Sequence, residues 1–119
     1  MRVKALTAAL LFLAAANADA ACTRPTATPP AMPNGATADE ETMKAAHDAI
    51  QAYVNQLEAY KACLKDQAEH APPDTPKEVA QTWIAQGDAA VDYASYIAAE
   101  FSATLKQFKA RQASTQTSK

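Results

Sequence analysis

A pair of prolines, Pro72-Pro73, divides a region of otherwise helical character into two halves of nearly equal length. Proline lacks a backbone N–H and its ring clashes with the preceding turn, so a helix cannot continue through this pair. We expect one helix over residues 38–70 and a second over residues 76–111, each about 50 Å long. Two matched helices joined by a short connection predict an all-α antiparallel helical hairpin over residues 37–112.

Each predicted helix begins with the same pattern, a threonine followed three residues later by a glutamate. The pattern occurs at Thr37 and Glu40 and again at Thr75 and Glu78. In such a capping box the threonine oxygen accepts from a free amide at the helix start, while the glutamate reaches back. Pro76 at the first helical position strengthens the second box.

Apolar residues recur through both predicted helices at the spacing of a coiled-coil seam. In the first helix the steps alternate between three and four, at Met43, Ala46, Ile50, Tyr53, Leu57, Tyr60 and Leu64. In the second helix the spacing is looser, at Val79, Trp83, Ala90, Ala94, Ile97, Phe101, Leu105 and Phe108. This pattern is typical of helices that pack along one another. Gly87, Ala90 and Ala94 are small enough to predict a close approach of the two helices.

Residues 1–20 have the three zones of a cleavable signal peptide. A charged start at residues 1–4 is followed by an apolar stretch, 5–16, and by an Ala-x-Ala cleavage box at residues 18–20. An uncleaved membrane anchor is the alternative, but the stretch is shorter than the ~20 apolar residues that span a bilayer. Cys22, just past the cleavage site, raises the alternative of a lipoprotein. A lipoprotein signal has a branched apolar residue three positions before its cysteine, and this chain has Asp19 there, which argues against lipidation. We therefore expect a periplasmic or secreted protein, with no stable membrane insertion after cleavage.

The mature chain is expected to begin with a proline-rich strap over residues 21–36. Its prolines preclude a helix and favour an extended polyproline-II path. Cys22 in the strap and Cys63 in the first helix are the chain's two cysteines, and such a pair in an oxidising compartment predicts one disulfide. The strap from Cys22 to Asp39 reaches about 50 Å in polyproline-II form, which is enough to lie back along the first helix to Cys63.

The charge balance excludes one class of partner. Removal of Arg2, Lys4 and Asp19 with the signal leaves nine basic and twelve acidic side chains, a net charge of −3. Nucleic-acid binding needs a basic stripe, so we expect no nucleic-acid partner. The only charged residues in 101–119 are basic, which indicates complementation of a helix dipole or a polar contact surface. The Ser/Thr/Gln-rich residues 113–119 are expected to form a disordered tail.

Four apolar residues of the second helix lie off the main seam and form our candidate interaction surface. Ile84 and Val91 are one heptad apart on a flank of the helix, and Tyr93 and Tyr96 extend the apolar surface on other sides. An apolar stripe this wide indicates a second packing surface, for a homodimer or for an envelope protein. The alternatives are that the strap covers this flank or that the residues are singly exposed, which is normal.

The residues that carry chemistry are few and scattered. His47 and His70 are separated by about 35 Å along one predicted helix, so they cannot share a metal within one hairpin. No nucleophile has a base at an interpretable spacing, and no glycine-rich phosphate loop occurs. We therefore expect no catalytic residue, no cofactor and no metal.

Two clusters of residues, one acidic and one aromatic, have both a functional and a structural interpretation. The acids Asp39, Glu40 and Glu41 could hold a cation, but first-turn acids that meet the helix dipole are the more common arrangement. The aromatic residues Tyr53, Tyr60 and Trp83 could line a ligand groove, but aromatics at seam positions usually belong to the core.

The order of these features resembles that of small exported proteobacterial proteins of unknown function. The resemblance is carried by Cys22, Pro33-Asn34-Gly35-Ala36-Thr37, Met43, Ala46, Tyr53, Tyr60, Cys63-Leu64, Ala89-Ala90-Val91-Asp92, Phe101 and Phe108-Lys109. It implies a signal peptide, two cysteines and a helical hairpin, and brings no activity, catalytic residue or cofactor. We expect a non-enzymatic periplasmic structural or protein-interaction module. The alternative is a periplasmic small-molecule or metal-binding protein.

Overall fold

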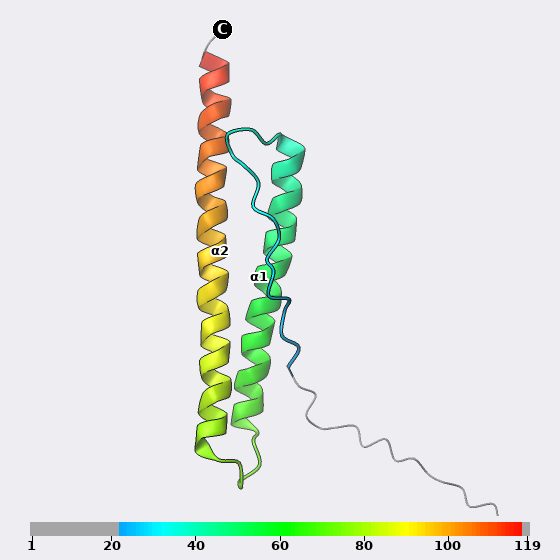
Figure 1. Ribbon diagram of the computed structural model, residues 1–119, viewed down its shortest axis with the longest axis vertical. Helices are drawn as coiled ribbons and strands as arrows, with labels where there is room; N and C mark the ends of the chain where they lie inside the picture. The colour runs from blue at the N-terminus through cyan, green and yellow to red at the C-terminus, as the bar shows by residue number, and fades with distance from the viewer. Residues whose placement is uncertain (1–21, 118–119) are drawn as a thin grey trace, which may run out of the picture.

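The computed structural model describes residues 22–117, and these residues form two α-helices and no strand (Figure 1). Helix α1 spans Glu40–Glu69 and helix α2 spans Lys77–Thr117. The predicted all-α class is confirmed, and so is the disulfide between Cys22 and Cys63. The predicted signal peptide, residues 1–20, lies outside the described residues.

Helix α1 begins two residues later than predicted, because Asp39 and not Thr37 caps it. The Asp39 side chain accepts a hydrogen bond of 2.7 Å from the backbone N–H of Thr42. Thr37 instead belongs to a turn, in which its N–H donates to the carbonyl oxygen of Asn34. The side-chain hydrogen bond with Thr42, followed by the backbone one, lowers the pKa of Asp39. A carboxylate at this position also meets the positive end of the helix dipole.

The connection between the helices lies where the proline pair predicts it. Helix α1 ends at Glu69, and the backbone N–H of His70 still donates to the carbonyl oxygen of Asp66, 3.0 Å away. Thr75 then donates its N–H to the Pro72 carbonyl in a turn. Helix α2 follows from Lys77, one residue after the predicted start.

Helix α2 continues to Thr117, so residues 113–117 are helical and our expectation of disorder there is wrong. Neither glycine nor proline occurs after Gly87, and the tail contains no residue that stops a helix. The Thr115 hydroxyl donates to the carbonyl oxygen of Arg111, one turn earlier, at 3.0 Å. A polar composition alone was therefore a poor sign of a helix end.

The two helices lie side by side, and their core forms from the seam residues (Figure 1). Buried apolar side chains of both helices make one cluster, consisting of Met43, Ile50, Tyr53, Leu57, Ala94, Ile97, Phe101 and Phe108. Gly87 is buried where the backbones approach closely, since a Cβ there would lie 3.2 Å from the Lys61 Cα. The predicted close approach at this glycine is confirmed. Val79, which we placed on the seam, is 38% exposed.

Residues 22–39, here called the N-terminal segment, have no helix or strand and run along the helix pair (Figure 1). One end is joined to α1 by the disulfide. Near the other end, Gly35 is buried against α2, where an added Cβ would collide with the Thr104 carbonyl oxygen. Arg111 of α2 donates to the carbonyl oxygens of Ala36 and Ala38. The segment is thus fixed to both helices.

Candidate functional site

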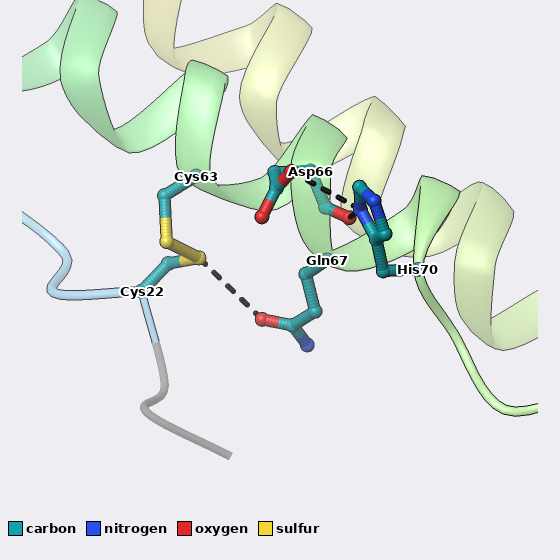
Figure 2. The surroundings of a disulfide bond; sticks show 5 residues. All are labelled: Cys22, Cys63, Asp66, Gln67 and His70. Atoms are coloured by element: carbon teal, nitrogen blue, oxygen red, sulfur yellow. Dashed lines mark hydrogen bonds and ion pairs between the residues drawn. A yellow bond between two sulfur atoms is a disulfide. The ribbon is translucent and has the colours of Figure 1, made fainter. Parts of the chain in front are cut away.

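The disulfide is the covalent anchor of the N-terminal segment (Figure 2). Cys22 and Cys63 are 41 residues apart in sequence, and their Cα atoms are 5.6 Å apart. The Gln67 side-chain oxygen lies 3.4 Å from Cys22 Sγ, one helical turn beyond Cys63. Both half-cystines are partly buried, so the bridge is packed against α1 and does not project into solvent.

A buried tyrosine provides a second anchor near the middle of α1. The Tyr53 hydroxyl donates a hydrogen bond of 2.7 Å to the backbone carbonyl of Thr26. Burial raises the pKa of Tyr53, and the hydroxyl therefore stays protonated and able to donate at neutral pH. Because the disulfide and this tyrosine lie along one side of the helix pair, they fix the side that the segment covers.

A groove of about 270 Å³ lies between the N-terminal segment and the two helices. Its lining is mainly apolar and aromatic, and consists of Arg24, Pro25, Thr26, Ala27, Tyr53, Leu57, Tyr60, Gln86, Ala89, Ala90 and Tyr93. We call it the tyrosine groove. Three tyrosines offer ring faces and hydroxyl groups, while Arg24 brings a positive charge and Gln86 an amide. This combination suits an amphipathic small molecule that carries an aromatic or anionic group.

The tyrosine groove differs in part from the sequence-based expectation. Tyr53 and Tyr60 line it as predicted, but Trp83 is not among the lining residues. Tyr93 takes part instead, with its ring edge-on to that of Tyr53 at a centroid distance of 6.5 Å. Arg24 also lines the groove, and sequence reasoning missed it because only the path of the N-terminal segment brings it there.

The candidate interaction residues do not form a single patch. Tyr93 lines the tyrosine groove, and its ring stacks on that of Tyr96 at 6.3 Å. Tyr96 is 58% exposed and donates its hydroxyl to Glu100. Val91 precedes Tyr93 by two residues, which is about 200° around a helix. Val91, and Ile84 one heptad before it, therefore lie on the opposite flank of α2.

This opposite flank continues along α2 and onto α1. Ile84 and Val91 continue at the same heptad position into Ala98 and Leu105. A second groove on this flank contains Ala98, Leu105 and Val54 of α1. We call the flank defined by Ile84, Val91, Ala98, Leu105 and Val54 the open side. Ile84 is 46% exposed, whereas Val54, Val91 and Leu105 are half-buried.

The two histidines lie at opposite ends of α1 with different surroundings. His47 Nδ1 is 3.3 Å from Asp48 Oδ1, and its ring lies beside that of Phe101. His70 Nδ1 lies 3.0 Å from the Asp66 carbonyl oxygen (Figure 2). This backbone hydrogen bond, followed by the Asp66 charge, raises the pKa of His70. Within residues 22–117, no group of three or more His, Cys, Asp or Glu side chains could hold a metal ion.

Asp88 and Asp92 lie one turn apart on α2, and a contact between the helices accounts for Asp88. Lys61 Nζ of α1 lies 3.1 Å from Asp88 Oδ1 of α2. Both side chains are substantially exposed, so we assign this ion pair a small contribution to stability. The pair lies beside Gly87, where the two helices approach closely.

Neither α1 nor α2 contains a stretch that is both long and apolar enough to cross a membrane. Comparisons with protein-family models, with curated proteins and with solved structures found no match to this chain.

Proposed function

We propose that this chain is an exported, non-enzymatic structural or protein-interaction module, built as an antiparallel helical hairpin with a proline-rich strap. The observation that carries the proposal is a difference between the two sides of the helix pair: the N-terminal segment covers one side and leaves the other uncovered. The N-terminal segment is bonded to one side through Cys22 and Tyr53. On the open side Ile84 is 46% exposed, and Val54, Val91 and Leu105 are half-buried. A covered side and an open side together suit a protein that binds another protein.

Stability considerations support a rigid binding module. A pair of helices buries only one stripe on each member, and small domains of this kind usually need a staple. Closing a loop of 41 residues stabilises a fold by about 4 kcal/mol in the chain-entropy model. A helix pair held in this way can present an apolar face without unfolding.

The disulfide also supports a location outside the cytosol, in the periplasm or the medium. Disulfides form and persist in oxidising compartments and are rare in reducing ones. This agrees with the signal peptide predicted over residues 1–20. Expression of the full chain with a C-terminal tag, followed by cell fractionation and N-terminal sequencing, tests both. A cytosolic product that retains Met1 would contradict the proposal.

Capture of a protein partner tests the interaction role directly. The exported, oxidised protein should retain an envelope protein or a second copy of itself on an affinity column. Ile84→Lys should reduce capture, because a charge in the open side opposes burial. Ala103→Lys introduces the same charge at an exposed site on a different face of α2 and is the control. A protein that stays monomeric and captures nothing would refute the interaction role.

A second candidate function is small-molecule binding in the tyrosine groove. The observation that favours it is the convergence of Tyr53, Tyr60 and Tyr93 with Arg24 around one cavity. A thermal-shift panel of aromatic carboxylates and of divalent metals should find a ligand that raises the melting temperature. Arg24→Gln should abolish the shift caused by an anionic ligand. A panel that causes no shift in the wild-type protein would reject this function.

A further inference from the structure

The open side is long enough to form a complete protein interface. From Ile84 to Leu105 its α2 stripe extends 21 residues, or about 32 Å at 1.5 Å per residue. Two adjacent helices, each about 10 Å across with its side chains, give it a width of about 20 Å. The resulting area is about 600 Å² for each partner and about 1,200 Å² for both, which reaches the lower limit of specific interfaces.

The chemistry of the open side favours an apolar helical partner and disfavours a charged one. Small uncharged residues, Ser95 and Ser102, lie next to the stripe and allow a second helix to approach closely. Asp88 and Lys109 each lie one turn from an end residue of the stripe, and Asp88 pairs with Lys61. A nucleic acid or another polyelectrolyte would find no charged row along this stripe.

The order of side-chain sizes along the stripe is complementary to its own reversed copy. If a second copy lies antiparallel across the stripe, Ile84 of one chain meets Leu105 of the other. Val91 then meets Ala98, so that a larger side chain faces a smaller one near the centre. Such a two-fold arrangement uses the same patch on both partners, as dimers of this symmetry do.

We propose that the open side binds the open side of a second copy of this chain, giving an antiparallel dimer that is a four-helix bundle. This inference rests on the proposed interaction function and names its partner. In the bundle, the N-terminal segments lie on the two outer surfaces, away from the interface. The tyrosine groove then stays accessible in the dimer.

Sedimentation equilibrium of the exported, oxidised protein over about a hundredfold range of concentration tests the dimer. We expect a reversible monomer–dimer equilibrium. Ile84→Lys should raise the dissociation constant at least about tenfold, because the two-fold symmetry places the introduced lysine in the interface twice. Ala103→Lys, an exposed site on a different face of α2, should leave the dissociation constant unchanged. Circular dichroism of each variant, recorded at the same time, verifies that both remain helical.

Site-directed cross-linking tests the antiparallel geometry. Ser95 lies near the expected two-fold axis, so the Ser95→Cys variants of two copies should be joined by a short bismaleimide. The native cysteines do not react, because they form the disulfide. Gln86→Cys is the control: it lies nine residues away, or about 180° around the helix, and lines the tyrosine groove. Equal cross-linking at both positions, or none at Ser95→Cys, would overturn the proposed geometry.

The two proposals fail in different ways. A chain that is monomeric in sedimentation but captures a different envelope protein would overturn the dimer and leave the interaction function intact. A chain that is monomeric and captures nothing would overturn both. A dimer that Ile84→Lys does not weaken would place the interface elsewhere and would overturn the role of the open side.

Discussion

The Tyr53 hydroxyl in the middle of α1 donates a hydrogen bond to the Thr26 carbonyl oxygen, 27 residues earlier in the chain and 2.7 Å away. The same ring is buried in the core between the helices and lies edge-on to Tyr93. One side chain therefore contributes to the core, holds the N-terminal segment and shapes the tyrosine groove. A change at Tyr53 should therefore affect the core, the attachment of the N-terminal segment and the shape of the tyrosine groove together.

Tyr53→Phe should separate the role of the hydroxyl from that of the ring. The ring still packs in the core, but the Thr26 carbonyl loses its donor, which we expect to cost about 1 kcal/mol of unfolding free energy. Urea denaturation measures this loss. Tyr96→Phe is the matched control, because the Tyr96 hydroxyl donates to Glu100 on the exposed surface and its loss should have little effect. Equal losses in the two variants would mean that the Thr26 contact does not hold the segment.

Cys63→Ser should destabilise the oxidised protein strongly. Loss of the 41-residue closed loop should lower the unfolding free energy by about 4 kcal/mol and the melting temperature by many degrees. Cys22→Ser and the double variant should give the same loss, because each change removes the same bond. Calorimetry under oxidising conditions measures the three variants beside the wild type. An unchanged melting temperature in Cys63→Ser would show that the N-terminal segment adds nothing to stability.

The sequence predicted the large features of this fold because strong local signals set them. Pro72-Pro73 cannot continue a helix, and the heptad spacing from Met43 to Leu64 identifies the buried stripe of α1. The disulfide followed from the cysteine count and from the reach of the strap. These signals do not depend on tertiary contacts.

The sequence-based predictions were wrong or incomplete where two local signals competed for the same helix start, or where tertiary contacts determined which residues lie close together. Thr37 and Asp39 are both good helix caps, and the turn formed at Asn34 left Asp39 to begin the helix. In the tyrosine groove, Arg24 became a lining residue through the course of the N-terminal segment. No spacing in the sequence encodes that proximity, so sequence reasoning alone could not place it.

The cap at Asp39 predicts a pH dependence of stability in acid. Its pKa is lowered in the folded protein from the ordinary value of 3.8, so the carboxylate stabilises the fold above that value. The contribution is lost as the pH falls through the lower, folded pKa. Asp39→Asn keeps a capping side chain but removes this charge, and its stability relative to the wild type should therefore depend on pH below about 5.

Urea denaturation at a series of pH values checks this dependence. The wild type should exceed Asp39→Asn in stability most clearly at neutral pH, and the two should converge in acid. Thr42→Val should also reduce the pH dependence, because the side-chain hydrogen bond with Thr42 is the largest cause of the lowered pKa. A constant difference between wild type and Asp39→Asn at all pH values would contradict the assignment.

Gly87 sets how closely the two helices approach, and enlarging it should force them apart. A Cβ at this position would lie 3.2 Å from both Cα and Cγ of Lys61, so the larger side chain in Gly87→Leu has no space without a backbone shift. Leucine has the better helix propensity, which favours the variant by up to about 1 kcal/mol. Overpacking at a buried contact costs about 1–3 kcal/mol, and we expect this cost to prevail, giving net destabilisation in urea denaturation. Ala85→Leu, an exposed site two residues before Gly87 on α2, is the control and should be nearly neutral. If Gly87→Leu were instead more stable than the wild type, helix propensity would outweigh packing, and the close contact with Lys61 would not limit the distance between the helices.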